Sequence, residues 1–492
     1  MLSSLLNNSR SIKQPIQWYI GLSVTSCCRR LEAALVGIHG TRMGSPVEIG
    51  HGLTIDLPRE IRAAYQEDLF PENTDVVTRN KGSDNGLSHY GTDADLSLFE
   101  IPTKTVLPRL SPSARRRLLE IQEETIRELL HIVGVTPSEL LAVGVHDPGV
   151  WCVDTFHDND LPNVSFRKTN SQSQDANGFS DEYIQSIQKI SPLFQETLCD
   201  TITLAARTGH NILDAFSAMD LSTGGQGGPF LPLSYWAILH SPDKHRLLLD
   251  LGQEVRMTFL PNSSHSNKMQ IGYGSAGVCG GLIDPIVQHL TDGEQTFDEA
   301  GRLAVQGTRL PELSEILERI ALFDVPSTRS HWSPFACLFA AKQVSAILEQ
   351  AKKKAWSLRD VLYTIAQSMS EHIARSIRQQ FGPILNDTEI LIAGGGSRHS
   401  ILVKQLQKEL RYGEWTTLDK LKILPNTLDA VAIAVLVSLT VNQIPGNLPH
   451  LTGAETECLL GRFIPGSPQN WQRLIQHITT AQPAVRSLRS AV

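Results

Sequence analysis

The feature that most constrains the fold is an apolar segment that leads through three consecutive glycines into a helix. A strand is predicted at residues 389–393, followed by Gly394, Gly395 and Gly396 and by a helix at residues 401–410. Glycines at such a junction let backbone N–H groups approach an anion, and the helix N-terminus adds partial positive charge. The segment predicts an α/β unit with a candidate phosphate-binding turn. A simple tight turn explains it equally well, because no Walker lysine follows.

Other segments repeat this alternation of apolar strands and helices along the chain. The chain opens on a buried strand, and 492 residues are enough for two domains. Alternating elements imply mixed or parallel sheets with helices on their faces. Strands are predicted at residues 19–24, 31–38, 140–146, 211–213 and 246–251, and helices at residues 113–133, 202–208 and 358–379.

Charge and cysteine usage exclude several classes of function. The net charge of −7 argues against a nucleic-acid-binding surface, which needs clustered Lys and Arg to replace counterions. The basic cluster at residues 115–117 lies at the start of a predicted helix and is typical of a solvated helix end. Seven scattered cysteines without metal-ligand spacing suit reduced thiols in the cytoplasm and predict no metal site.

The apolar runs are all shorter than the roughly 20 residues that span a bilayer, so no membrane partner is expected. The basic, Ser-rich first residues leave a mitochondrial presequence open as an alternative to a cytoplasmic location. Residues 68–95 and 156–179 are rich in Asn, Asp, Ser and Gln or Gly, and both predict exposed loops.

A second glycine-rich loop follows a carboxylate. Asp220 precedes residues 221–229, which include Gly224, Gly225 and Gln226. A carboxylate there could accept a proton from water or from a sugar hydroxyl, while the loop lets a substrate approach the backbone. An Asp that only caps a turn is an equally good interpretation of the spacing.

His146 ends a predicted strand and is followed by residues 147–149, Asp-Pro-Gly. It is a candidate substrate-contacting imidazole. A hydrogen-bonded residue in a Pro-Gly turn is the favoured alternative, because the sequence offers no partner for the ring.

In their order, these segments resemble the anhydro-N-acetylmuramic acid kinase family from about residue 21 to about residue 466. Residues 220–232 are similar to the family pattern D-x-A-x-G-G-Q-G-A-P-L-x-P, and residues 393–402 to C-G-G-G-A-x-N-x-x-L. Residues 451–454 (Leu-Thr-Gly-Ala) also match, and Asp429 stands where the family usually has Glu. Several ordered matches are far more specific than any one of them.

The resemblance implies a two-lobed actin-like ATPase fold of the ribonuclease-H-like type. Each lobe would hold a mixed sheet flanked by helices, with a cleft between the lobes. Residues 1–145 are expected to form the first lobe and residues 146–492 the second, with a return of the last helix to the first lobe left open. The family also suggests a homodimer.

The resemblance further assigns site residues. Asp220 falls on the family's catalytic aspartate. ATP and magnesium are the expected cofactors of an active protein, with no tightly bound cofactor and a small sugar as substrate. The implied nucleotide-binding residues are Gly21, Thr25, Ser26, Gly252, Gly277, Gly394, Gly395 and Gly396, and the implied substrate-binding residues are His146, Gly224, Gly225, Gln226 and Asp429.

The phosphate loops depart from the family pattern. The family's first loop, G-L-M-S-G-T-S-x-D-G, ends here in Arg29-Arg30. N-I-G-G-I-A-N corresponds to residues 250–256, where Gln253 and Glu254 follow a single glycine. F-D-T-G-P-G-N corresponds to residues 274–280, with Ser in place of the acid. The H-G-Q-T turn is reduced to His146, and D-F-R has become Ala-Phe-Ser at residues 215–217.

By resemblance, the reaction is ATP-dependent hydrolytic cleavage and phosphorylation of a 1,6-anhydro amino sugar, with Asp220 activating water. We predict that this activity is weak or lost. General-base assistance supplies roughly 10²- to 10⁴-fold, whereas phosphoryl transfer rests on charge stabilisation that the altered loops would not provide. The alternative is a non-catalytic, pseudokinase-like protein that binds a sugar or a partner. An active kinase with Arg29 or Arg30 as a phosphate clamp is a third interpretation.

Overall fold

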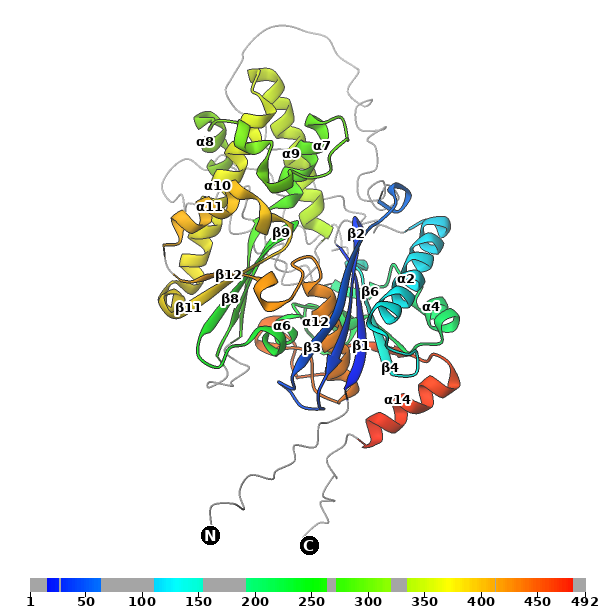
Figure 1. Cartoon of the computed structure of the whole chain (residues 1–492). Coiled ribbons are helices and arrows are strands. Elements are labelled where there is room, and N and C mark those ends of the chain that lie inside the picture. Colours follow the sequence, from blue (N-terminus) through cyan, green and yellow to red (C-terminus); the bar gives the residue numbers. More distant parts are fainter. Residues whose placement is uncertain are drawn as a thin grey trace, which may run out of the picture.

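A computed structural model describes residues 16–25, 28–62, 110–153, 192–262, 271–319, 334–411 and 413–480. Its core consists of two mixed sheets with helices around them (Figure 1). This confirms the predicted α/β class. Among the described helices none is long and apolar enough to cross a membrane. The two polar segments predicted as loops lie outside these residues.

The first sheet has six strands in the order β13-β7-β4-β1-β2-β3. β4 lies parallel to β1 and β7, whereas the pairs β1-β2, β2-β3 and β7-β13 are antiparallel. The bounds are Gln17–Val24 (β1), Arg30–Ile38 (β2), Val47–Asp56 (β3), Leu140–His146 (β4), Ile212–Asp214 (β7) and Arg462–Ile464 (β13).

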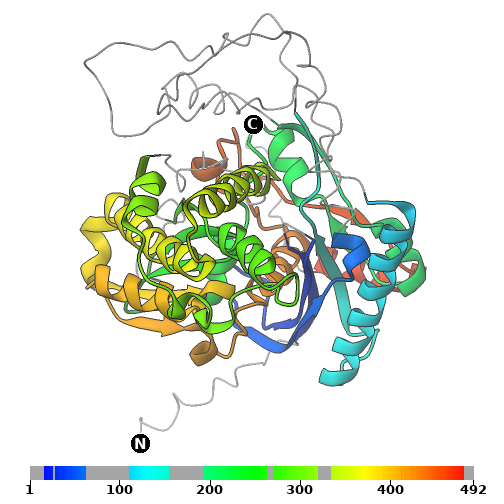
Figure 2. The same cartoon turned by 90° about the horizontal axis from the view of Figure 1, so that it is seen from above.

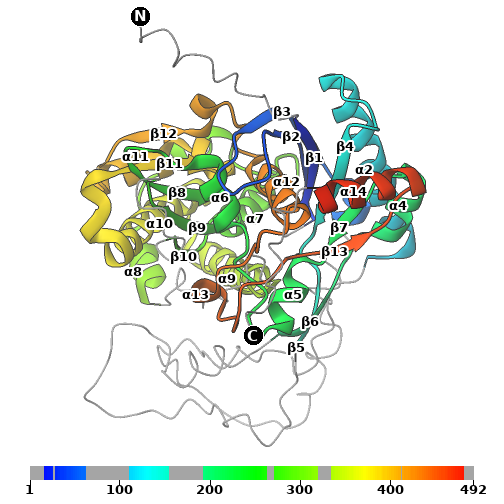
Figure 3. The same ribbon diagram turned by 90° about the horizontal axis from the view of Figure 1, so that it is seen from below.

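Strands β7 and β13 therefore join the first sheet from beyond residue 145, and α14 (Pro468–Thr480) lies close to β4 (Figure 3). The division of the chain at residue 145 stays a proposal. Strands β5 (Val150–Val153) and β6 (Pro192–Glu196) form a separate two-stranded sheet.

The second sheet has five strands in the order β10-β9-β8-β11-β12, with β8 parallel to β11 and antiparallel to β9. Apolar β-branched and leucine side chains fill β8 and β11 because both faces of these central strands are covered. The bounds are His245–Leu251 (β8), Glu254–Leu260 (β9), Gly272–Val278 (β10), Thr388–Ala393 (β11) and Trp415–Thr417 (β12).

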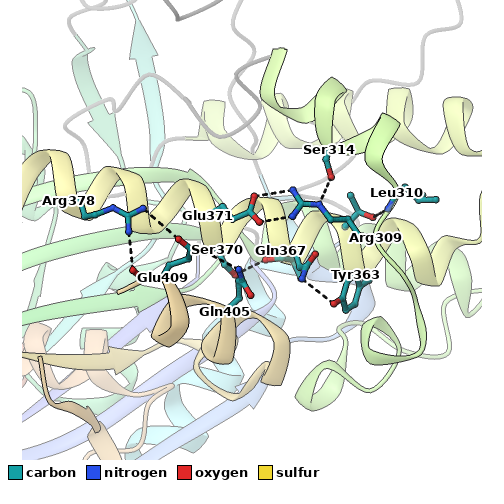
Figure 4. Close-up of polar contacts among 12 residues, drawn as sticks. Arg309, Leu310, Ser314, Tyr363, Gln367, Ser370, Glu371, Arg378, Gln405 and Glu409 are labelled. Carbon is teal, nitrogen blue, oxygen red and sulfur yellow. Dashed lines mark hydrogen bonds and ion pairs between the residues drawn. The ribbon is translucent and has the colours of Figure 1, made fainter. Parts of the chain in front are cut away.

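Helix α10 (Leu358–Phe381) lies over the second sheet with α7 (Gly280–Leu290), α8 (Pro311–Arg319), α9 (Pro334–Lys354) and α11 (Ser400–Glu409). Arg309 forms a two-pronged ion pair with Glu371 at 2.7 and 3.1 Å, and Arg378 donates to the carbonyl of Glu409 at 3.0 Å (Figure 4). These contacts tie α10 to its neighbours on both sides.

Helices α2 (Pro112–Val133) and α4 (Thr201–Thr208) pack against the first sheet. Seen from above, cyan α2 lies on the opposite side of the molecule from the yellow and green helices α7 to α10 (Figure 2). Ser111 caps α2 by accepting from the N–H of Ala114, and Gly134 ends it in the left-handed conformation.

Helix α12 (Leu428–Val441) is apolar on all sides, which predicts a helix buried all round. All of its residues are buried, and it contacts β1, β2 and β4 of the first sheet as well as α6 (Pro232–Leu239). Gly21 lies directly under this helix, where a Cβ atom would collide with the Ala430 carbonyl oxygen. Asp429 in the first turn of α12 also comes near the carboxyl end of β8, because Arg256 contacts both Asp429 and Asp250.

Candidate active site

Asp220 is fully buried in the last turn of α5 (Phe216–Ser222). Its Oδ2 accepts from the Gly227 N–H at 2.9 Å, and its Oδ1 accepts from Asn447 Nδ2 at 3.0 Å. Gly225 leaves space for this carboxylate, because a Cβ there would overlap Asp220 Oδ2. The loop therefore folds around the carboxylate and holds it in one orientation, and each oxygen keeps capacity for a second hydrogen bond.

The loop after Asp220 is held against the segment at residues 452–455. Gln226 N–H donates to the Thr452 carbonyl at 3.0 Å, and Glu455 N–H donates to the Thr223 carbonyl at 2.8 Å. Gly224 adopts φ 80°, which favours glycine. Two motifs that are distant in sequence thus lie side by side.

Asp429 lies in the first turn of α12, where Tyr235 Oη donates to its Oδ1 at 2.5 Å and Arg256 contacts its Oδ2 at 3.0 Å. Arg256 also pairs with Asp250 at the end of β8. Burial raises the pKa of Asp250, and Arg256 opposes that effect. One buried arginine therefore pairs with carboxylates from β8 and α12.

His146 is buried at the end of β4 and meets the Phe230 ring edge-on at a centroid distance of 5.2 Å. Burial lowers the pKa of His146 to about 3, although the charge of Asp429 acts in the opposite direction. The imidazole is therefore neutral near pH 7. A neutral ring has one nitrogen that donates and one that accepts a hydrogen bond.

The amide groups that begin α7 are already used within the protein. Cys279 and Gly281 donate to the Gln253 carbonyl at 2.7 and 3.1 Å, and Gly280 donates to the Gly252 carbonyl at 3.0 Å. Gly277, in the left-handed conformation, donates to Ser275 Oγ at 3.3 Å. A helix N-terminus whose N–H groups bind carbonyls offers little to a phosphate.

Arg29 lies beside this same turn. Its Nη1 contacts Asp284 Oδ2 in α7 at 2.5 Å, and Gln253 Nε2 donates to that oxygen at 2.9 Å. Thr25 Oγ1 accepts from the Arg30 N–H at 3.1 Å, so the threonine closes its own hairpin. Ser26 lies outside the described residues.

The Gly394 turn meets the Gly252 turn at the carboxyl ends of the parallel strands β11 and β8. Gly394 has φ 76°, and a Cβ on it would lie 2.8 Å from the Gly252 nitrogen. Gly396 packs against Leu251, while Gly395 faces open space. The Gly252 and Gly394 turns thus lie side by side, whereas Gly21 packs under α12.

Several groups at this turn are therefore engaged within the protein. The amides at the start of α7 bind the Gln253 and Gly252 carbonyls, and Arg29 pairs with Asp284. A magnesium–phosphate site requires anionic support for the metal and open donors for the phosphate.

Three residues that interact with Asp429 or Asp220 were not predicted from the sequence: Glu32, Tyr235 and Asn447. Glu32 had a signal, since it is a lone acid within an apolar strand. Tyr235 and Asn447 carried none, because their contacts with Asp429 and Asp220 join elements about 200 residues apart.

Comparison with known proteins gives a consistent result. A family model described as anhydro-N-acetylmuramic acid kinase matches residues 188–466. The chain is 31% identical over 268 residues to the anhydro-N-acetylmuramic acid kinase of Nitrosospira multiformis, covering 54% of this chain and 69% of that protein. It is 27% identical to the kinase of that name from Shewanella pealeana, covering 91% and 98%.

Two solved structures are more distant. Xylulose kinase from Rhodospirillum rubrum has a TM-score of 0.33 and 10% identity, with 94% and 97% of the two chains covered. The activator of 2-hydroxyisocaproyl-CoA dehydratase from Clostridium difficile has a TM-score of 0.35 and 12% identity, with 86% and 94% covered. These scores are too low to support an argument.

Proposed function

Because the chain belongs to the anhydro-N-acetylmuramic acid kinase family, we propose that it binds a 1,6-anhydro amino sugar beside Asp220 with kinase activity that is weak or lost. The supporting observation is the contrast between the Asp220 loop and the N-terminal end of α7. The Asp220 loop is complete and ordered around its carboxylate, whereas the α7 amides that would face phosphate bind the Gln253 and Gly252 carbonyls.

On the sugar side, Asp220 would accept a proton. Its two oxygens are held by Gly227 and Asn447, and the Gln226 loop beside it is fixed to the Thr452 segment. A carboxylate held in this way would bind a sugar hydroxyl or orient a water molecule. Asp429 and His146 would supply further polar contacts for the same ligand.

On the nucleotide side, the proposal rests on the charge of Arg29 and on the N–H donors at the start of α7. Removing a single donor from a site that stabilises developing negative charge typically costs about 10²- to 10³-fold in rate. Three α7 amides are engaged here, and Arg29 is neutralised by Asp284. Ligand binding without phosphoryl transfer is the function that these contacts favour. A cytoplasmic location and a homodimer remain parts of this proposal.

The test combines binding and turnover on the full-length protein. We expect calorimetry to detect binding of 1,6-anhydro-N-acetylhexosamines and expect no ATP- and magnesium-dependent phosphorylation of them. Asp220→Asn should weaken sugar binding about 10- to 100-fold, because a charge-assisted hydrogen bond is lost. The matched control is Asp243→Asn, an exposed aspartate that should leave binding unchanged.

Two results would contradict parts of the proposal. Turnover that Asp220→Asn abolishes and Asp243→Asn preserves would establish an active kinase. Absence of binding by every anhydro sugar, with a protein that melts cooperatively, would overturn the sugar-binding role and leave the partner-binding alternative.

A further inference from the structure

Asn447 is a buried residue between α12 and α13 (Pro449–Thr452), and its side-chain amide forms three hydrogen bonds. Its Nδ2 donates to Asp220 Oδ1 at 3.0 Å and to the Thr456 carbonyl at 3.1 Å. Its Oδ1 accepts from the Cys458 N–H at 2.7 Å. Both N–H groups of the amide and its carbonyl oxygen are therefore in use.

The backbone around Asn447 decides which end of this amide faces Asp220. The Cys458 N–H can only donate, so it requires the amide oxygen, and the Thr456 carbonyl can only accept, so it requires the NH2 group. An amide turned by about 180° would lose both bonds and set its oxygen against the Asp220 carboxylate. The N–H end is thus directed at Asp220 by contacts that do not involve Asp220.

The segment that carries Asn447 is itself held in place. The Gly446 N–H donates to the Cys458 carbonyl at 3.1 Å and closes this segment into a loop. The Thr452 carbonyl, in the same loop, accepts from the Gln226 N–H at 3.0 Å and so joins it to the loop that follows Asp220. A donor on a segment held at both ends keeps a precise position.

Asp220 needs a second donor to fix the plane of its carboxylate. In the part of the chain that the structure describes, its Oδ2 is bound by the Gly227 N–H and its Oδ1 by Asn447. The last torsion of an aspartate is broad, so a carboxylate bound through one oxygen can still turn about its Cβ–Cγ bond. A bond to each oxygen removes that freedom. The direction in which Asp220 meets a ligand hydroxyl then depends on Asn447.

Resting on the proposed binding of a sugar beside Asp220, we infer that Asn447 is a positioning residue for that carboxylate. It acts through Asp220 and not by contact with the sugar. It sets the plane of the carboxylate, so that the remaining capacity of the two oxygens meets a sugar hydroxyl or a water molecule in one direction. An amide is required at this position, because one side chain must donate to Asp220 and accept from Cys458.

Asn211 provides a matched structural control. Both Asn211 and Asn447 are 1% exposed. Asn211 Nδ2 donates to the Leu141 and Asn470 carbonyls at 3.1 and 3.0 Å, and its Oδ1 accepts from the Gly466 N–H at 3.1 Å. Asn211 thus also forms three hydrogen bonds, but none of them reaches a carboxylate. Replacing either asparagine with alanine should lower the free energy of unfolding by a similar amount.

The experiment compares Asn447→Ala with Asn211→Ala in the full-length protein, with 1,6-anhydro-N-acetylmuramic acid as the probe in calorimetry. We expect Asn447→Ala to weaken binding about tenfold and Asn211→Ala to change it by less than about twofold. In an Asp220→Asn protein, Asn447→Ala should weaken binding by less than about twofold further, because the carboxylate that it positions is gone. Urea denaturation checks that each variant folds.

Asn447→Asp keeps the shape of the side chain and the acceptor for Cys458, so it replaces the alanine variant if that variant fails to fold. Its second oxygen would face Asp220 where an N–H stood, and affinity should fall about tenfold or more. Combining it with Asp220→Asn restores a donor and an acceptor between the two side chains. The combined variant should be more stable than Asn447→Asp alone, yet bind the sugar no more tightly than Asp220→Asn.

The outcomes separate this inference from the proposed function. A folded Asn447→Ala or Asn447→Asp protein that binds the sugar as wild type does overturns the inference and leaves sugar binding intact. The same holds if Asn447→Ala weakens binding about tenfold further in the Asp220→Asn protein, or if Asn211→Ala weakens binding equally. Binding of no anhydro sugar by the folded wild type overturns both.

Discussion

At the scale of single residues, Arg256 holds together carboxylates that would otherwise repel one another. Its guanidinium pairs with Asp250 and Asp429, and the three side chains are 13%, 10% and 8% exposed. Removing one member of a buried ion pair leaves uncompensated charge, which is the costly event rather than the loss of a contact. We therefore expect Arg256 to contribute strongly to the stability of this region.

We predict that Arg256→Met lowers the free energy of unfolding by about 3–5 kcal/mol at pH 7, measured by urea denaturation. Arg302→Met is the matched control, because the Arg302–Glu299 pair is exposed on the surface and should contribute within about 0.5 kcal/mol. Equal effects of the two substitutions would show that the buried carboxylates do not need Arg256.

A second residue-scale prediction concerns pH. Burial raises the pKa of Glu254 from 4.5 to about 7, with Arg256 opposing that shift. The folded state therefore binds a proton that the unfolded state releases, so this group's contribution to stability is present below pH 4.5 and is lost as pH rises through about 7.

Urea denaturation at pH 5 and pH 8 should accordingly show wild type losing more stability than Glu254→Gln over that interval, by about 1–3 kcal/mol. The variant keeps a side-chain oxygen for Ser275 Oγ, which donates to Glu254 at 3.2 Å in the wild type. Parallel losses in the two proteins would assign the pH dependence to other groups.

Residues that are close in sequence were predicted better than residues that meet through tertiary structure. The Asp220 loop could be identified because its carboxylate, glycines and Gln226 are contiguous. The partners of Arg256 come from β8 and α12, and Glu32 approaches them from β2. Strand register and helix packing set these distances, and neither can be obtained from local pattern. The roles given to the site residues remain predictions.

At the scale of elements, the packing of α12 on β1 determines the geometry of the region. Gly21 was predicted to approach phosphate, yet its missing side chain admits the Ala430 backbone. Apolar periodicity correctly predicted β1, β8, β11 and α10, because burial sets that pattern directly. It could not show that β7 and β13 complete the first sheet, since both are three-residue strands with little pattern.

We predict that Gly21→Ala destabilises the protein by more than about 3 kcal/mol, because backbone atoms of α12 cannot move aside as a flexible side chain can. Gly395→Ala is the matched control: a Cβ there meets nothing within 4 Å. Thermal and urea unfolding of the two variants would be compared. If the Gly21→Ala protein were as stable as the Gly395→Ala protein, Gly21 would not be needed for the close approach of α12.

At the scale of the whole molecule, the Arg29–Asp284 pair connects the two sheets. Arg29 adjoins the β1-β2 hairpin of the first sheet, and Asp284 lies on α7, which packs with the second sheet. The side chains are 18% and 12% exposed, so solvent screens the pair only in part. The same contact occupies the position at which a phosphate clamp was considered.

A double-mutant cycle of Arg29→Ala and Asp284→Ala should give a coupling energy of about 1–3 kcal/mol in urea denaturation. Because Arg29 is engaged with Asp284, MgATP should shift the melting temperature of wild type and of Arg29→Ala equally little. Stabilisation by MgATP that disappears in Arg29→Ala would instead support the phosphate-clamp interpretation.

The position of α12 and β13 in the chain also affects how the protein is made. The β1-β2 hairpin leaves the ribosome early, but the helix that covers it and the strand that closes the first sheet are residues 428–441 and 462–464. Because synthesis proceeds at about 5–20 residues per second, the apolar face of the hairpin stays exposed for tens of seconds. Newly made chains should therefore depend on chaperones until synthesis is nearly finished.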